Sequence, residues 1–221
     1  MTDQRADVDW RDSGVPVSRQ FDDPYYSLDD GVAETRHVFL TGNALPNRFR
    51  DGFHVAELGF GTGLNFLVTL AAWRSADIQG RLKFTSFEAF PMPMADLHRA
   101  LGHFDGLPVD VFEEHEGRLA AQIAGDDFDL TVVEGDARET LPRWSSSADA
   151  WYLDGFSPAK NPELWGDELM SEVGKHTATN GTFATYTAAG FVRRALTAAG
   201  FTIERTPGFG RKRHMTRGVR L

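Results

Sequence analysis

Three glycines on alternate positions stand between a strand-like and a helix-like segment, and this arrangement is typical of a turn that binds a nucleotide. They are Gly59, Gly61 and Gly63, within residues 57–66. Glycine accepts positive φ and lets backbone N–H groups approach a ligand, and the following helix directs the positive end of its dipole into the same space. The run predicts a nucleotide-binding turn, with a turn that only packs a helix on a strand as the alternative.

The spacing of these glycines separates two classes of ligand. A dinucleotide motif requires Gly-x-Gly-x-x-Gly, but Leu64 holds the last position counted from Gly59, and Phe66 holds it counted from Gly61. Alternate glycines preceded by an acid, here Glu57, resemble instead the S-adenosylmethionine loop of class I methyltransferases.

Two further acids follow strand-like segments, and we expect them to face the same cleft as the glycine turn. Glu88 lies 25 residues beyond Gly63, where a carboxylate can accept hydrogen bonds from both hydroxyls of a ribose. Asp136 ends the next strand-like segment and is predicted to bind an adenine amino group. Taken singly, each acid is more typical of a helix cap or a solvated side chain than of a ligand site.

A second specific run, residues 151–162, carries an acid out of a buried strand into a turn rich in glycine and proline. The acid is Asp154, and its position resembles the Asp-Pro-Pro-Tyr loops of amino-group methyltransferases. In those loops an acid or amide accepts a hydrogen bond from the amine, and an aromatic ring packs on the nucleobase. The alternative is a turn whose aspartate only caps backbone amides.

The chemistry limits what Asp154 can do. A carboxylate of pKa about 4 is a poor base for an alkylammonium of pKa about 10, since full proton transfer would be uphill by roughly 8 kcal/mol. We expect Asp154 to accept a hydrogen bond from an already neutral amine and to stabilise the positive charge that develops on it. Water takes the first proton, at a cost of roughly 4 kcal/mol at pH 7.

Strand and helix signals alternate along the chain in the order that builds a parallel sheet. The expected strands are Val55–Leu58, Leu82–Glu88, Phe128–Val133, Ala150–Leu153, Thr182–Tyr186 and Phe201–Arg205, with a last edge strand near Arg213–Val219. The expected helices are Asn65–Ala76, Met94–Leu101 and Phe191–Ala199.

These elements predict an α/β fold with a Rossmann-like doubly wound sheet. The resemblance of the glycine turn implies that this sheet is of the class I S-adenosylmethionine-dependent methyltransferase type. We expect it to occupy residues 52–221, preceded by a small β-hairpin lid at residues 1–51 that includes Pro24–Ser27 and His37–Leu40.

Composition excludes several kinds of site and partner. The chain has no cysteine, which rules out disulfides and thiolate ligands, and it has no apolar signal core or membrane-spanning run, so we expect a cytoplasmic protein. The net charge is −9, yet residues 201–221 carry six Lys or Arg against one acid, which makes this end +5 and the remainder −14. A basic end is compatible with a docked polyanion, but taken alone it favours a solvated terminal strand with scattered positive charge.

The chain also resembles a known family, the tRNA 5-methylaminomethyl-2-thiouridine methyltransferases of the MnmC/MnmD type. The matching strings cover most of the sequence: Tyr26-Ser27 with Gly31, Glu34–Leu40, Gly42-Asn43, Glu57–Phe66, Asp154–Pro162 with Trp165, and Pro207–Arg213. The resemblance implies methyl transfer from S-adenosylmethionine to the amine of 5-aminomethyl-(2-thio)uridine at the wobble position of tRNA.

The resemblance also implies roles for individual residues. Those that would hold the cofactor are Glu57, Gly59, Gly61, Gly63, Asn65, Glu88 and Asp136. Asp154 and Phe156 would face the amine and the uracil as catalytic residues. Those that would contact substrate or RNA are Glu34 and Asn43, from a lid over the cleft, with Lys160, Arg211, Lys212 and Arg213 against phosphates.

Several absences belong to the same expectation. We expect no metal and no membrane partner. We also expect no FAD, since the chain ends near the point where many relatives begin an FAD-dependent oxidase domain. A separate enzyme would then supply the aminomethyl nucleoside in the anticodon loop. Two alternatives remain: a class I methyltransferase acting on a small-molecule or protein amine, and a non-catalytic nucleotide-binding regulator.

Overall fold

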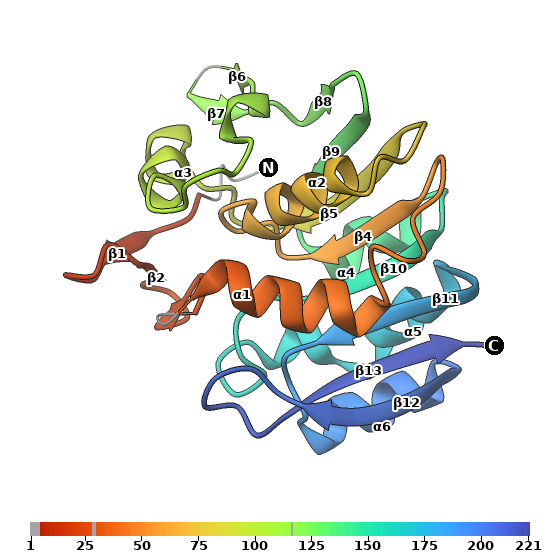
Figure 1. Cartoon of the computed structure of the whole chain (residues 1–221). Helices are drawn as coiled ribbons and strands as arrows, with labels where there is room; N and C mark the ends of the chain where they lie inside the picture. The colour runs from red at the N-terminus through yellow and green to blue at the C-terminus, as the bar shows by residue number, and fades with distance from the viewer. Residues whose placement is uncertain (1–4, 28–29, 116) are drawn as a thin grey trace.

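The computed structural model describes residues 5–27, 30–115 and 117–221, and its centre is an eight-stranded sheet (Figure 1). Residues 1–4 and 28–29 of the expected lid lie outside the described residues. The strands of the central sheet are, in spatial order, β12 (Phe201–Pro207), β13 (His214–Arg220), β11 (Thr177–Thr185), β10 (Ala148–Leu153), β4 (His54–Leu58), β5 (Leu82–Glu88), β9 (Phe128–Glu134) and β8 (Gln122–Ala124).

The middle of the sheet is parallel, as expected for strands that read as continuous apolar runs. The pairs β9–β5, β5–β4, β4–β10 and β10–β11 are parallel, whereas β8 and β13 each run antiparallel to their neighbours. The expectation of a last edge strand near residues 213–219 is wrong in one respect, because β13 inserts between β11 and β12 and leaves β12 at the edge.

Two layers of helices cover the sheet and bury its two faces (Figure 1). The helices of the first layer are α1 (Gly31–Thr35) and α2 (Leu64–Ser75), with α3 (Met94–Leu101) beside them. Those of the second layer are α4 (Ala137–Thr140), α5 (Asp167–Lys175) and α6 (Gly190–Ala198). Within the described chain, no helix is long and apolar enough to cross a membrane.

The N-terminal region contains the expected hairpin, but not where all of its sequence signals lie. β1 (Val8–Trp10) and β2 (Pro16–Ser18) form an antiparallel pair that β3 (Asp23–Pro24) extends to three strands. His37–Leu40 is not part of this sheet, because α1 continues into a π-helical turn at Arg36–Leu40. Asp30 caps α1 by accepting a hydrogen bond from the Ala33 N–H, and the following apolar run packs into the core as helix.

The sheet changes winding direction between β4 and β10, and this position determines where a ligand site can form. From β4 the chain builds outward through β5 and β9 on one side, and β10 and β11 lie on the other. Ligands of doubly wound folds bind outside the carboxyl ends of the strands at such a point. The small β1–β3 sheet lies at this end of the parallel strands (Figure 1). A two-stranded ribbon, β6 (Glu114–His115) with β7 (Arg118–Leu119), lies beyond α3.

Candidate active site

The glycine turn leaves β4 in a conformation that side chains rarely adopt. Gly59, Gly61 and Gly63 have φ of 88°, 55° and 75°, so each requires the left-handed freedom of glycine. The Gly61 N–H donates to Oε2 of Glu88 at 2.9 Å, and α2 begins directly after Gly63. A Cβ at Gly61 would lie 3.3 Å from Cδ1 of Tyr25, so the turn is packed closely under the N-terminal segment.

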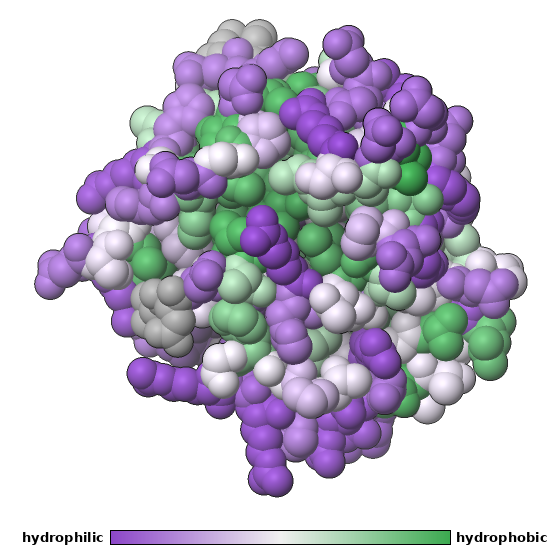
Figure 2. Space-filling model, viewed as in Figure 1, coloured by the Kyte–Doolittle hydropathy of each residue, from purple (hydrophilic) through white to green (hydrophobic). Residues whose placement is uncertain are grey.

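This turn forms one wall of a cavity of about 840 Å³. That volume lies within the range of sites that bind whole cofactors and drug-sized ligands. The sequence-predicted residues that line it are Glu34, Gly59, Gly61, Asn65, Glu88, Asp136, Asp154, Phe156, Lys160, Arg211 and Lys212. On the side of the molecule that Figure 1 faces, Figure 2 shows hydrophobic residues near the middle and mostly hydrophilic side chains around them.

A chain of buried polar groups connects the floor of the cavity to Asp154. Glu57 is fully buried at the end of β4 and accepts hydrogen bonds from Ser86 Oγ (2.7 Å) and Asn65 Nδ2 (2.8 Å). The same Asn65 amide donates to Oδ2 of Asp154 at 2.8 Å, and its carbonyl oxygen accepts from the Thr35 hydroxyl at 2.7 Å. Asn65 therefore holds two carboxylates from neighbouring strands in fixed positions, one beneath the cavity and one in its wall.

Burial raises the pKa values of these three acids. Burial is the largest cause that raises the pKa of Asp154, to about 6, and the Asn65 and Gly155 hydrogen bonds act in the opposite direction. Burial also raises the pKa of Glu57 and of Glu88 above their ordinary values, opposed by the hydrogen bonds that each accepts. A positive charge or a hydrogen-bond donor placed beside these carboxyl groups would favour their ionised form.

Glu88 and Asp136 are held by different groups. The Glu88 carboxylate accepts backbone N–H groups on both oxygens, among them those of Gly61 and Phe90. Asp136 caps α4 through the Arg138 N–H at 2.9 Å and also pairs with the Arg138 guanidinium, whose hydrogen bonds lower the pKa of Asp136. Asp136 is thus both the helix cap considered from sequence and a residue of the cavity wall.

The loop after β10 is fixed by side chains from two other elements. Tyr186, directly after β11, donates its hydroxyl to the Gly155 carbonyl at 2.9 Å, and Trp165 Nε1 donates to the Phe156 carbonyl at 3.0 Å. Asp154 Oδ1 accepts from the Gly155 N–H at 2.8 Å, so the carboxylate is held from both sides. The loop geometry is set by the protein before any ligand binds.

The Phe156 ring is itself covered by the N-terminal segment. Phe21 stacks on it with ring centroids 4.6 Å apart, and Tyr25 meets it edge-on at 5.2 Å. Asp23 accepts a hydrogen bond from the Ser157 N–H at 2.7 Å. Residues 21–25 therefore form a strap across the cavity.

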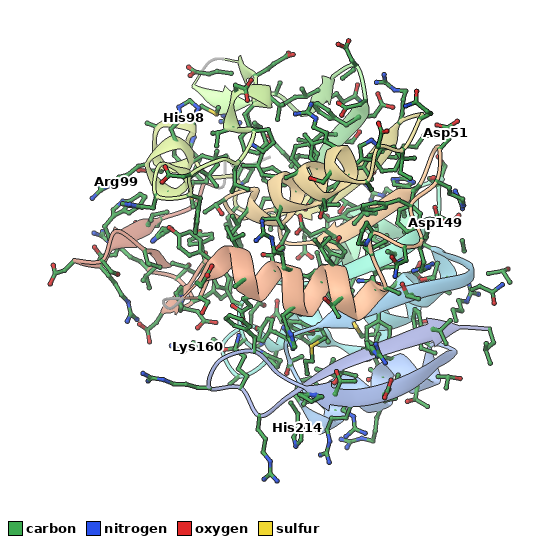
Figure 3. All side chains as sticks on the ribbon, in the orientation of Figure 1. Asp51, His98, Arg99, Asp149, Lys160 and His214 are labelled. Atoms are coloured by element: carbon green, nitrogen blue, oxygen red, sulfur yellow. The ribbon has the colours of Figure 1, made fainter. Side chains whose placement is uncertain are left out.

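Of the residues expected to contact RNA phosphates, two have partners inside the protein. Lys160, labelled in Figure 3 beside the N-terminal end of α1, bonds to Asp22 of the strap, with Nζ 2.5 Å from Oδ2. Lys212 bonds to Glu34 in the cavity wall at 2.8 Å. Arg211 and Arg213 are exposed, and within the described residues neither forms an ion pair.

Asn43 is the one predicted substrate residue that the structure buries away from the cleft. It has no exposed surface, and its amide donates to the Phe39 and Trp151 carbonyls while its carbonyl oxygen accepts from Thr182. Asn43 therefore ties the segment after α1 to the sheet and does not face a ligand. Gly63, Glu57 and Arg213 also lie outside the cavity lining, Glu57 directly beneath it.

Sequence reasoning did not single out several residues that the structure brings to the cavity. Tyr186 directly follows β11, the strand next to β10, a position that could have drawn attention to it. Phe21 and Tyr25 reach the cavity from a short irregular segment, which carries no periodic signal. Across the described residues, no cluster of three or more His, Asp or Glu could hold a metal ion.

Residues 103–221, more than half of the chain, match the model of a protein family described as S-adenosyl-L-methionine-dependent methyltransferase. The chain is also 45% identical over 232 residues to the tRNA 5-methylaminomethyl-2-thiouridine biosynthesis bifunctional protein MnmC of Pseudomonas aeruginosa, a match that covers 98% of this chain and 35% of the relative. The same-named protein of Stutzerimonas stutzeri is 43% identical, over 97% of this chain and 34% of the relative. The chain thus spans about a third of these curated relatives.

Among solved structures, the fold is similar to that of MnmC2 from Aquifex aeolicus, with a TM-score of 0.75 and 24% identity over 98% of this chain and 71% of that chain. It is also similar to the glycopeptide N-methyltransferase MtfA in complex with S-adenosylmethionine, with a TM-score of 0.51 and 16% identity over 87% of this chain and 94% of that one. At these identities the likeness establishes the fold.

Proposed function

This chain belongs to a family of S-adenosyl-L-methionine-dependent methyltransferases, and we propose that it methylates the amine of 5-aminomethyl-(2-thio)uridine at the wobble position of tRNA. The observation that carries the proposal is the position of Asp154. Asp154 lies at the carboxyl end of β10, in the wall of the cavity that the glycine turn also lines. Asn65, two residues after the last glycine of that turn, donates a hydrogen bond to the Asp154 carboxylate. The identity to proteins named for 5-methylaminomethyl-2-thiouridine biosynthesis supports this nucleoside as the substrate.

The cofactor would lie between the glycine turn and the ends of β5 and β9. The backbone of Gly59–Gly63 would contact its methionine part, Glu88 would accept the ribose hydroxyls, and Asp136 would approach the adenine. Two observations support the fit: the Glu88 carboxylate lies in the cavity wall beside the turn, and the three glycines of the turn carry no Cβ atoms. The cofactor supplies an electrophilic methyl group on a sulfonium.

The residues of this chain would position a neutral amine and stabilise its product. The S–CH3 bond breaks and an N–CH3 bond forms, so positive charge moves to the nitrogen, where Asp154 would accept a hydrogen bond. With the pKa of Asp154 at about 6, deprotonation of an alkylammonium of pKa about 10 by this carboxylate would still be uphill by roughly 5 kcal/mol. Asp154 therefore acts as an acceptor and water takes the proton.

We infer that the tRNA partner is contacted by the exposed basic side chains at the cavity rim. Arg211 lies in the lining and Arg213 lies two residues further along the chain, and both residues are exposed. A wobble nucleoside lies in the anticodon loop, where single-stranded bases can be turned out of the stack and inserted into a pocket.

The proposal is tested by incubating the protein with labelled S-adenosylmethionine and tRNA from a strain lacking this methylation, followed by digestion to nucleosides. We expect label on 5-methylaminomethyluridine derivatives alone. Label on another nucleoside, or none, would overturn the substrate assignment. Transfer to a protein or small-molecule amine without tRNA would favour a different class of acceptor.

A further inference from the structure

One ion pair lies in the wall of the cavity itself, between elements far apart in the chain. Lys212, from the loop between β12 and β13, places Nζ 2.8 Å from Oε1 of Glu34 on α1. The Glu34 side chain is only 14% exposed. Its other carboxylate oxygen accepts no hydrogen bond from the described residues. Lys212 thus differs from Arg211 and Arg213 of the same loop, since neither of these has an acidic partner in the described chain.

An aromatic ring fixes the Lys212 ammonium relative to the acceptor loop. The Lys212 nitrogen lies 4.1 Å from the centroid of the Tyr186 ring, a geometry favourable for a cation–π contact. Tyr186 in turn donates its hydroxyl to the carbonyl of Gly155, the residue after Asp154. The ammonium is therefore tied, through one ring, to the loop that carries the proposed amine acceptor.

The backbone around Lys212 is also held in place. His37 Nε2 lies 3.0 Å from the Pro207 carbonyl, and the His37 and Phe209 rings are in contact with centroids 6.0 Å apart. These contacts dock the β12–β13 loop against the helical segment that carries Glu34. Lys212 is consequently positioned over the cavity in the folded protein without any RNA present.

The charges at this place have a direct consequence for an amine. The titratable groups that face one another here are Asp154, Glu34, Lys212, Tyr186, Asp23 and Glu57. Glu34 raises the pKa of Asp154 and Lys212 lowers it, so both charges act at the acceptor. With Lys212 present, the trio of Asp154, Glu34 and Lys212 carries a net charge of −1 when ionised, and without it −2.

That difference decides the protonation state of a bound amine. An ammonium has no lone pair and cannot attack the methyl group, and a pocket of greater negative charge holds the amine in that form. Building on the proposed function, we propose that Lys212 is a positioning residue of the acceptor site whose ammonium, by neutralising Glu34, keeps the incoming amine unprotonated and nucleophilic. A net charge of −1 then matches the single positive charge of the product.

The test is the pH dependence of kcat with aminomethyl tRNA and S-adenosylmethionine both saturating, because kcat reports ionisations of the bound complex. In Lys212→Met, the limb of the profile that rises with pH should shift to higher pH by about one unit. At pH 7 this shift corresponds to about a tenfold loss of kcat. Lys212→Gln should show the same shift, and Lys212→Arg should show none because it keeps the charge. Cofactor affinity and thermal midpoint establish that each variant is folded.

The decisive variant removes both charges. Glu34→Gln combined with Lys212→Met restores the net charge of −1, so the limb should return to its wild-type position. Arg205→Met, which removes an exposed positive charge of β12 outside the cavity lining, should leave the limb where it is.

Two results would overturn the role of Lys212. One is an unmoved limb in folded Lys212→Met and Lys212→Gln, accompanied by a smaller salt dependence of tRNA affinity, which would make Lys212 a phosphate ligand. The other is a shift that Glu34→Gln fails to reverse. Absence of methyl transfer by the wild-type protein would instead overturn the proposed function, so the two failures are distinct.

Discussion

At the scale of single residues, the site depends on an amide that serves two acids. The two hydrogens of Asn65 Nδ2 satisfy Glu57 and Asp154, and the Thr35 hydroxyl fixes the amide by donating to its oxygen. An amide is suited to this position because it donates to both carboxylates without adding a charge of its own. The sequence suggested Asn65 as a cofactor residue, whereas its hydrogen bonds in the structure hold the two acids in register.

The buried charge of Asp154 should reduce stability at neutral pH. Its pKa is about 6 in the folded protein and about 4 in an unfolded chain, so stability falls as pH rises through this interval. Asp154→Asn removes that cost, and we expect it to raise the free energy of unfolding at pH 8 by about 1–3 kcal/mol while abolishing turnover. Urea denaturation at pH 8 and pH 4 measures the effect, which should vanish at pH 4.

Asp136 provides a control of opposite sign. The hydrogen bonds of Arg138 lower its pKa, so its contribution to stability is present above its unfolded pKa and is lost as pH falls through the folded value. Asp136→Asn should therefore lower stability at pH 8. An Asp154→Asn protein less stable than wild type at pH 8 would contradict this assignment of the buried charge.

At the scale of elements, the glycine turn combines backbone strain with a close contact. An alanine at Gly61 would have to adopt φ of 55° and place its Cβ 3.3 Å from Tyr25, whereas Gly106 has φ of 76° and nothing within 4 Å. Each change costs about 1–2 kcal/mol of strain. Calorimetry should show that Gly61→Ala weakens S-adenosylmethionine binding by about tenfold, or ~1.4 kcal/mol, and that Gly106→Ala does not. Equal losses would exclude a local role for the turn.

The strap at residues 21–25 is an element whose contacts can be removed singly. Phe21 stacks on Phe156 and meets Phe90 edge-on at 5.8 Å, so Phe21→Ala deletes the apolar part of its attachment. We expect amide hydrogen exchange across residues 16–24 to accelerate by tenfold or more, on the order of 1.4 kcal/mol of lost protection. Trp10→Leu, which removes the Arg99 contact at the far end of this sheet, should leave exchange at residues 21–24 near wild type.

The sequence allowed the prediction of elements with long apolar patterns and not of short or polar ones. The strands around Val55–Leu58 and Leu82–Glu88 are buried apolar runs bounded by turns, so the sequence predicted both that they are strands and where they lie. His37–Leu40 is too short for periodicity to separate helix from strand, and α5, with its acidic first turn, was missed. The pairs Lys160–Asp22 and Lys212–Glu34 join residues 138 and 178 positions apart, beyond any local signal.

At the scale of the whole molecule, the fold redistributes the basic charge of the C-terminal end. Three of its six basic residues have partners, since Lys212 pairs with Glu34, Arg217 pairs with Glu204, and Arg220 donates to the Thr177 carbonyl. The other three are Arg205, Arg211 and Arg213, which are exposed and, among the described residues, form no ion pair. The positively charged surface available to a polyanion is therefore smaller than the six basic residues of this end would suggest.

This distribution predicts which arginines determine the salt dependence of tRNA binding. Each phosphate contact releases counterions, so the logarithm of affinity should fall linearly with the logarithm of salt concentration. Arg211→Gln and Arg213→Gln should each reduce the magnitude of that slope by about one.

Arg217→Gln is the matched control: it removes the same charge from the same region, but the Arg217 guanidinium already bonds Glu204 at 2.7 Å. Filter binding between 50 and 300 mM salt, roughly the range where such slopes are linear, measures all three. An equal change in all three variants would mean that tRNA responds to the overall charge of this end, with no defined contact at the cavity rim.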